Sequence, residues 1–249
     1  MIDIHSHIIP KIDDGAKDLE TSLRLLEIAR DGGTKSIIAI SHYYKGFYNF
    51  EYKDISRKIE VLKTLAKNNF IDIDIYYGQE ICFFKDMFKE LEERKIGTIN
   101  NTKYMLIEFP LDDFTKDIFD EIYELQIRGI QPIIAHPERY KVFKNNPQEI
   151  NKLIEEGYLF QLNSGSILGE FSKETKKTAE LFLKNNIYSF IGSDAHNLKT
   201  RTSSLGRINE ALDMQYINQY KNNGIKMLRD EEVKFRGEVV QKKKKFIFF

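Results

Sequence analysis

Cysteine, tryptophan and long apolar runs are scarce in this chain of 249 residues, and each scarcity excludes a class of protein. Cys82 is the only cysteine, so no internal disulfide can form and a reducing compartment is expected. No apolar run reaches the roughly 18 residues of a membrane span, and the start MIDIHSH has no signal-peptide features. Basic and acidic residues both number 38, which gives no sign of a basic face for nucleic acid. We therefore expect a cytoplasmic protein without stable membrane insertion and without a nucleic-acid partner.

Short apolar runs rich in Ile, Val, Tyr and Phe alternate along the chain with longer segments of helical periodicity. Such runs are typical of strands buried on both faces of a parallel sheet covered by helices. The predicted strands span Ile2–His5, Ser36–His42, Ile73–Gln79, Tyr104–Phe109, Pro132–His136, Leu159–Asn163 and Tyr188–Ser193. The predicted helices span Asp18–Arg30, Lys53–Lys67, Lys116–Arg128, Pro147–Glu156 (with Asn146 as its cap), Lys173–Asn185 and Ser203–Tyr220.

Seven strands alternating with helices predict an α/β fold, a TIM-like barrel of (β/α) units with one strand fewer than the usual eight. No repeat and no linker rich in Pro, Gly or Ser divides the chain. Residues 1–249 are therefore expected to form a single domain, with a short basic and apolar tail at about 241–249. In such barrels the functional groups gather at the carboxyl ends of the strands.

Metal-binding residue types stand at the ends of the predicted strands. All the histidines of the chain do so: His5, His7, His42, His136 and His196. Alternate residues of a strand point to the same side, so residues 5–7 (His-Ser-His) and 194–196 (Asp-Ala-His) can each offer two ligands to one ion. Glu80 and Glu108 end two further strands. Imidazoles and carboxylates without thiolates predict a multinuclear Mn, Fe or Zn site in a hydrolase.

A series of motifs carries a family resemblance: MIDIHSHIIPKIDDG, ISH, YGQE, IEF, IIAHPERY and SDAHN. Their order and spacing resemble the polymerase-and-histidinol-phosphatase (PHP) superfamily, from Met1 to about Ile217. The closest likeness is to its bacterial tyrosine-protein phosphatase branch, which accompanies capsule and exopolysaccharide synthesis. The resemblance implies a distorted seven-stranded barrel, the PHP fold, that holds three divalent metal ions. Manganese is the expected metal, with iron or zinc as alternatives.

The resemblance also distributes ligands among the three ions. The expected sets are His5, His7, Glu80 and Asp194 for the first ion, Glu80, Glu108 and His136 for the second, and Asp14, His42 and His196 for the third. Both Asp13 and Asp14 follow the first strand in a loop that can turn back into the barrel mouth. Motif position favours Asp14, whereas the residues alone leave the two open.

Two arginines are expected over the same mouth. Arg139 follows His136 by three residues and Arg201 follows His196 by five, and the resemblance places phosphate-binding arginines in both loops. A planar guanidinium can hold phosphate oxygens in a bidentate manner. The alternative for Arg139 is an ion pair on the rim, for example with Glu138. His42 is a further catalytic candidate, as a proton donor.

Aromatic residues are concentrated in the loop after the second strand, and two more follow Glu80: Tyr43, Tyr44, Phe47, Tyr48, Phe50, Tyr52, Phe83 and Phe84. They are candidates for flanking a phenol ring, or they pack the loop onto the barrel. Cys82 is expected to be a packing residue, because the C-x5-R pattern of cysteine-dependent tyrosine phosphatases is absent: Phe88 stands six residues later. The tail Lys242–Phe249, KKKKFIFF, suits an anionic membrane surface or a partner, but we favour a frayed or packed terminus.

These features together favour a metal-dependent protein-tyrosine phosphatase. The resemblance implies that its substrate is a tyrosine-phosphorylated protein, namely the tail of a bacterial tyrosine kinase that controls capsule or exopolysaccharide synthesis. One alternative is a phosphomonoesterase for a small molecule such as histidinol phosphate. Another is a metal-binding PHP module without catalysis, which the full ligand set disfavours.

Overall fold

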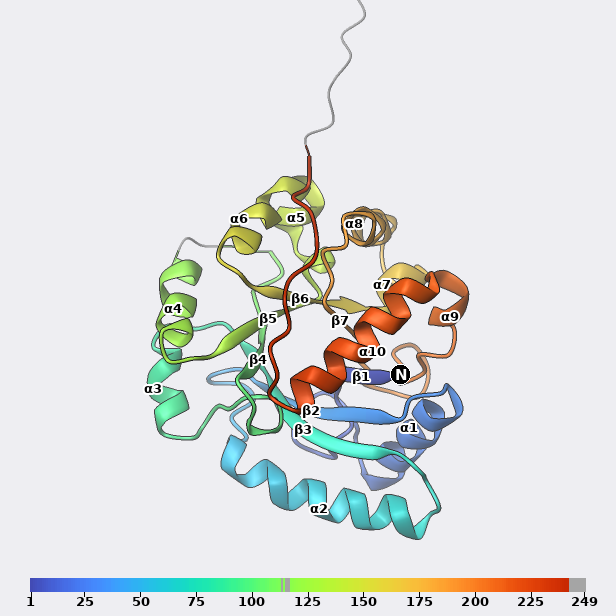
Figure 1. Cartoon of the computed structure of the whole chain (residues 1–249). Coiled ribbons are helices and arrows are strands. Elements are labelled where there is room, and N and C mark those ends of the chain that lie inside the picture. Colours follow the sequence, from blue (N-terminus) through green and yellow to red (C-terminus); the bar gives the residue numbers. More distant parts are fainter. Residues whose placement is uncertain (113, 115–116, 242–249) are drawn as a thin grey trace, which may run out of the picture.

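The computed structural model describes residues 1–112, 114 and 117–241. The expected tail at 242–249 lies outside these residues. Seven parallel strands form one sheet in chain order and curve into a nearly closed barrel (Figure 1). They are β1 (Ile2–Ser6), β2 (Ser36–Tyr43), β3 (Asp74–Cys82), β4 (Tyr104–Glu108), β5 (Gln131–Ala135), β6 (Leu159–Asn163) and β7 (Phe190–Gly192). The predicted α/β barrel is confirmed.

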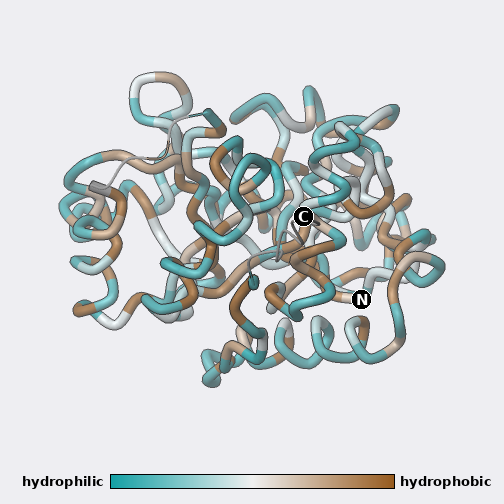
Figure 2. The backbone as a smooth tube through the Cα atoms, turned by 90° about the horizontal axis from the view of Figure 1, so that it is seen from above, coloured by the Kyte–Doolittle hydropathy of each residue, from teal (hydrophilic) through white to brown (hydrophobic). Residues whose placement is uncertain are grey.

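Helices surround the barrel on its outer side, and in Figure 2 their coils alternate between hydrophilic and hydrophobic residues. The α-helices are α1 (Leu19–Asp31), α2 (Tyr52–Asn68), α3 (Met87–Glu92), α4 (Asp117–Gln126), α5 (Lys141–Asn145), α6 (Ile150–Glu155), α7 (Ser164–Leu168), α8 (Lys173–Lys184), α9 (Ile208–Ala211) and α10 (Met214–Leu228). Short 3-10 helices are η1 (Ile99–Asn101), η2 (Pro137–Arg139) and η3 (Pro147–Glu149). Within the described part of the chain, no helix is long and apolar enough to cross a bilayer.

Two helix predictions were wrong in detail. The segment predicted as one helix, Ser203–Tyr220, contains α9 and the first part of α10, which continues to Leu228. The two helices are separate because Leu212 and Asp213 have extended backbones and Leu212 is buried in the core. The segment Pro147–Glu156 is η3 followed by α6. Asn146 does not cap it with its side chain, since the amide Nδ2 donates to Glu149 Oε1 at 3.0 Å.

The inner face of the barrel changes from apolar to polar along each strand. Near the amino ends it is a buried apolar cluster that includes Ile38, Ile40, Tyr104, Leu106, Ile133, Leu159 and Phe190. Side chains on a strand repeat with period two, so the same face continues with His42 two residues after Ile40, and with Glu108 two residues after Leu106. The fold therefore gathers the polar strand ends above an apolar floor.

β1 has a bulge around His5, and His7 directly follows the end of the strand. Asp3 pairs with Ile37 and Ser6 with Ala39, so β1 has one residue more than β2 between these pairs. The buried Asp3 carboxylate accepts from His5 N at 3.1 Å and from Ser193 N at 2.9 Å, which joins the bulge to the end of β7. Beyond it, His7 N donates to Ala195 O at 2.8 Å, which links the end of β1 to the segment after β7.

The segment after α10 crosses the amino ends of the strands, as the dark red trace in Figure 1 shows. Its backbone is held by Tyr104, whose hydroxyl donates to Glu231 O at 2.6 Å and accepts from Val233 N at 2.9 Å. Val233 is buried in the inner apolar cluster. This segment closes the end of the barrel opposite the polar strand ends.

Candidate metal centre

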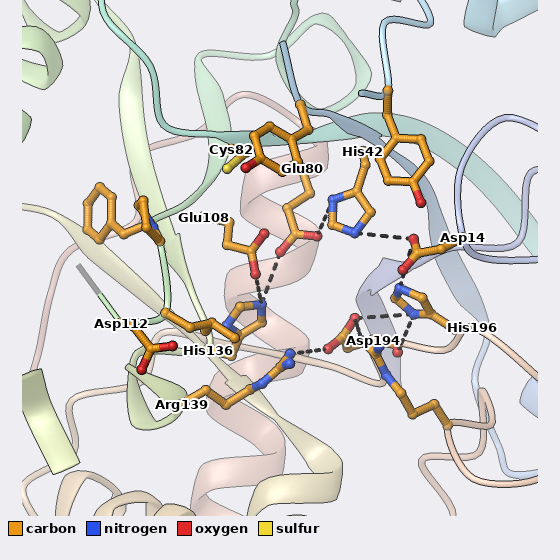
Figure 3. A pocket seen from close by; sticks show the side chains of 16 residues that line it. Asp14, His42, Glu80, Cys82, Glu108, Asp112, His136, Arg139, Asp194 and His196 are labelled. Atoms are coloured by element: carbon orange, nitrogen blue, oxygen red, sulfur yellow. Dashed lines mark hydrogen bonds and ion pairs between the residues drawn. The ribbon is translucent and has the colours of Figure 1, made fainter. Parts of the chain in front are cut away.

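Glu80, on β3, lies at the centre of the polar cluster. Its Oε2 is 3.2 Å from His5 Nε2, from His7 Nε2 and from His42 Nδ1. Its Oε1 is 3.0 Å from His136 Nε2, which also lies 3.5 Å from Glu108 Oε1 (Figure 3). One buried carboxylate thus contacts histidines from three strand ends and can bridge ions.

Asp14 is a second carboxylate that contacts histidines of the cluster. Its Oδ1 lies 3.5 Å from His42 Nε2 and 3.5 Å from His196 Nε2, and Figure 3 shows the carboxylate pointing toward both rings. Asp13 has a different role, because its Oδ2 contacts His7 Nδ1 at 3.0 Å and accepts from His42 N at 2.9 Å. Asp13 therefore orients two of the expected ligands from outside, and Asp14 is the carboxylate among the ring nitrogens.

Three of the five histidine rings are held in a tautomer that suits metal binding. His5 Nδ1 is 3.0 Å from Gln161 Oε1, His7 Nδ1 is 3.0 Å from Asp13, and His196 Nδ1 is 2.9 Å from the carbonyl oxygen of Asp194. Each of these partners is an acceptor, so each Nδ1 donates its hydrogen and each Nε2 is left facing the carboxylates, free to bind an ion. This arrangement suits a cation between the rings and the carboxylates.

The electrostatics of the cluster also favour positive charge among the carboxylates. Burial lowers the pKa of His7, but its hydrogen bond to Asp13 and the charge of Glu80 outweigh burial and raise the pKa to about 10. Burial would raise the pKa of Glu80, yet the adjacent His5 and His42 rings hold it well below its usual range. Burial and the charge of Glu80 keep the pKa of Glu108 well above normal. A divalent ion beside Glu108 would replace its proton.

Groups of ligand atoms lie close enough to share ions. Three sets have their ligand atoms within 4.8 Å of one another: His7, Asp14, His42 and His196; His5, His7 and Glu80; and His42, Glu80 and Glu108. These sets contain seven of the nine expected ligands, and His7, His42 and Glu80 each belong to two sets. The other two join the cluster through contacts, His136 Nε2 with Glu80 Oε1 at 3.0 Å and Asp194 Oδ1 with His5 Nε2 at 3.5 Å. The donor chemistry fits divalent ions such as Mn, Fe or Zn.

Two of the expected ligand residues have strained backbones. His136 has φ of 32° and Asp194 has φ of 53°, the left-handed region that residues with a Cβ rarely adopt. Such outliers persist where surrounding structure enforces them, and they are frequent at functional sites. His136 directly follows β5, and Asp194 lies two residues after the end of β7, so both are at the barrel mouth.

Asp194 connects the cluster to both arginines. Its Oδ1 lies 3.5 Å from His5 Nε2 and 2.5 Å from Arg201 Nη2, while its Oδ2 accepts from Arg139 Nη1 at 2.8 Å. The suggested Arg139–Glu138 ion pair was therefore wrong. Within the described part of the chain, the buried Nε of Arg201 has no hydrogen-bond partner.

Sequence reasoning missed the hydrogen-bonding roles of two β6 residues. Asn163 Nδ2 donates to Asp194 Oδ2 at 2.7 Å, and Gln161 Oε1 contacts His5 Nδ1. Residues 161 and 163 lie two apart on one strand, so the period-two rule could have placed both on the inner face. Glu138 is likewise buried, accepting from Asn163 N at 3.0 Å and from the Tyr188 hydroxyl at 3.0 Å.

The cluster opens into a cavity of about 490 Å³. Its lining includes, besides the cluster and the arginines, Tyr44, Tyr48, Cys82, Phe109, Pro110, Leu111 and Asp112. The expectation that Tyr43, Phe83 and Phe84 flank this mouth was wrong. Tyr43 is buried with its hydroxyl donating to Glu90 at 3.1 Å, and the two phenylalanines pack on the outer core because β3 continues to Cys82.

Cys82 borders the cavity, but its chemistry is unsuited to attack. Burial and the charges of Glu108 and Glu80 raise the pKa of its thiol to about 12. A thiol in such negative surroundings stays protonated near neutral pH and is a poor nucleophile.

Comparison with known proteins places this chain in a family. The family model for capsular polysaccharide synthesis, CpsB/CapC, matches residues 1–232. The chain belongs to this family. The likeness to the PHP superfamily is thereby confirmed, because the metal-dependent tyrosine phosphatases of the family are PHP proteins.

Relatives of this family match nearly the whole chain. The tyrosine-protein phosphatase YwqE of Bacillus subtilis (strain 168) is 35% identical over 256 residues, covering 100% of both chains. The tyrosine-protein phosphatase CpsB of Streptococcus pneumoniae is 34% identical over 221 residues, covering 87% of this chain and 91% of the relative. A crystal structure from a study of YwqE from Bacillus subtilis and CpsB from Streptococcus pneumoniae, described as unique metal-dependent tyrosine phosphatases, matches with a TM-score of 0.89. It has 32% identity and covers 97% of this chain and 100% of that one.

Proposed function

We propose that this protein is a metal-dependent phosphoric monoester hydrolase that removes phosphate from phosphotyrosine in proteins. The observation that carries the proposal is the cluster around Glu80 and Asp14, in which the Nε2 atoms of oriented histidines face carboxylates beside two arginines. The relatives bearing the name tyrosine-protein phosphatase support the substrate class.

The proposed ligands are the nine residues of the cluster, and the proposed occupancy is three divalent ions, with manganese first and iron or zinc as alternatives. They are His5, His7, Asp14, His42, Glu80, Glu108, His136, Asp194 and His196. Bound divalent ions lower the pKa of water and neutralise phosphate charge. His42 has both ring nitrogens directed at carboxylates, and burial followed by the His7 charge lowers its pKa to about 4, so its geometry favours a ligand role over proton donation.

Three divalent ions would exceed the charge of the four proposed carboxylate ligands by two, so the centre would attract an anion. Arg139 and Arg201 would hold the non-bridging phosphate oxygens, since both guanidinium groups line the cavity and both are anchored on Asp194. Phenolate leaves readily because the pKa of phenol is about 10, so the reaction depends little on a proton donor.

The proposed partner is the tyrosine-phosphorylated tail of a bacterial kinase that controls capsule or exopolysaccharide synthesis. The family's link to capsular polysaccharide synthesis supports this partner. The proposed location is the cytoplasm, because kinases that use ATP phosphorylate their targets there.

Substrate comparison tests the proposal. The metal-loaded protein should hydrolyse phosphotyrosyl peptides with a kcat/KM at least about tenfold above that for phosphoseryl peptides or histidinol phosphate. Phenyl phosphate serves as the control for leaving-group reactivity. A higher kcat/KM for histidinol phosphate would replace the proposal with its main alternative, a small-molecule phosphatase.

A further inference from the structure

A short turn after β2 stands at the rim of the cavity. Tyr44 and Tyr48 pair across it, with Tyr44 N donating to Tyr48 O at 2.8 Å and Tyr48 N to Tyr44 O at 2.9 Å. Gly46 has φ of 92°, which the tight turn requires, and its N donates to Asn49 Oδ1 at 2.9 Å. We call residues 44–48 the aromatic turn. Its backbone is fixed by hydrogen bonds at both ends.

The aromatic turn presents two rings to solvent. Phe47 is 73% exposed and Tyr44 is 45% exposed, and their ring centroids lie 4.6 Å apart. Lys45 lies between them in the sequence, and its Nζ donates a hydrogen bond to Glu90 Oε1 at 2.8 Å. The turn therefore offers flat apolar surface without a free lysine charge. Rigid exposed aromatic rings of this kind are typical of binding surfaces.

The aromatic turn is continuous with the metal centre. The ring of Tyr48 stacks on the ring of His42 with centroids 5.9 Å apart and an interplanar angle of 16°. Tyr44 and Tyr48 both line the cavity, together with Pro110 and the 38% exposed Leu111 from the loop after β4. Aromatic surface thus begins beside a proposed ligand and continues outward to Phe47.

We propose that the aromatic turn docks the peptide that carries the phosphotyrosine. Tyr48 and Leu111 border the phenol ring, and the exposed Tyr44–Phe47 pair receives an apolar or aromatic side chain next to the phosphotyrosine. This inference rests on the proposed function, since it takes the phosphate to be held by the metal centre and the arginines. The phenol ring of the phosphotyrosine then extends from the metal centre toward the cavity rim. There the neighbouring peptide residues meet the exposed Tyr44–Phe47 pair.

The test is a double-mutant cycle in which kcat/KM of the metal-loaded enzyme is measured for protein variants and for two peptides. Two phosphotyrosyl peptides differ only in the neighbouring residues, which are leucine or glycine, and phenyl phosphate is the substrate without a peptide. The wild-type protein should prefer the leucine peptide by about tenfold in kcat/KM, and Phe47→Ala should abolish that preference. The matched control is Phe70→Ala, which removes a 90% exposed phenylalanine from the connection between α2 and β3 at the opposite end of the barrel. It should keep the preference.

The outcomes separate this inference from the proposed function. A leucine preference that survives in Phe47→Ala overturns the docking surface, while peptide hydrolysis itself leaves the phosphatase function standing. A change in sedimentation of Phe47→Ala with the preference intact would assign the pair to self-association and also overturn the inference. Failure of the wild-type protein to hydrolyse either peptide, with turnover of other phosphomonoesters, would reject the proposed function first.

Discussion

Arg139 combines an expected role in phosphate binding with an ion pair to Asp194. It is expected to bind phosphate, yet its guanidinium is 2.8 Å from Asp194 Oδ2 and lies 5.0 Å from the centre of the Phe171 ring. Removal of the side chain would therefore take away a phosphate contact and would also leave Asp194 with one fewer partner.

We predict that Arg139→Ala lowers kcat/KM by roughly 100-fold, because a charged donor aimed at the transition state is lost. Metal content, measured by elemental analysis of the same preparation, should stay near wild type, since Asn163 and Arg201 still hold Asp194. Unchanged kinetics would reduce Arg139 to an ion-pair partner of Asp194. A loss of metal would show that its main role is to position this ligand.

Cys82 provides the contrasting case of a residue at the mouth without a catalytic role. Its pKa of about 12 and the absence of a C-x5-R loop both argue against a phosphocysteine step. We predict that Cys82→Ser keeps turnover within a few-fold of wild type in a phosphate-release assay. Loss beyond about 10³-fold, or a trapped phosphocysteine, would reverse the mechanism.

At the scale of elements, the site depends on how α10 packs against β1, the strand that contains His5 and leads directly into His7. Gly224 allows this contact, because a Cβ placed there would lie 3.1 Å from Cβ of Ile2. Cβ of Ile2 is attached directly to the strand backbone and cannot move aside without moving β1. An alanine in this position would therefore strain the contact although alanine favours helices.

We predict that Gly224→Ala lowers the free energy of unfolding by about 1–3 kcal/mol through overpacking. Asn222→Ala, at an exposed position of the same helix, is the matched control and should raise it by about 0.5 kcal/mol through helix propensity. Urea denaturation of the three proteins measures both effects. A stabilised Gly224→Ala protein would show that β1 adapts to α10.

The strands were more predictable from sequence than several of the helices. Each strand is a short apolar run that can be recognised in the sequence. The start of α1 is indicated by its N-cap residue Asp18, whose side chain accepts from Thr21 N at 2.8 Å. The helices α3, α5 and α7 have five or six residues each and are too short to show a helical period. The break between α9 and α10 depends on the burial of Leu212, which is a tertiary contact.

At the scale of the whole molecule, parallel strands made the candidate site predictable because all their carboxyl ends meet at one mouth. Residues recognised at strand ends, such as Glu80 and His42, were therefore brought together as expected. The aromatic border of the cavity was only partly predictable. Tyr43 and Tyr44 are adjacent in sequence, yet one is buried and the other lines the mouth. Which side each ring takes depends on the length of the strand and on the turn that follows.

The central claim is that the cluster binds divalent ions and that phosphotyrosine hydrolysis depends on them. The most direct measurement is phosphate release from a phosphotyrosyl peptide by chelator-treated protein during titration with Mn²⁺, with bound metal counted by elemental analysis. We predict no turnover without metal, and recovery that saturates near three ions per chain. Full activity in protein that holds less than one transition-metal ion per chain would contradict the account.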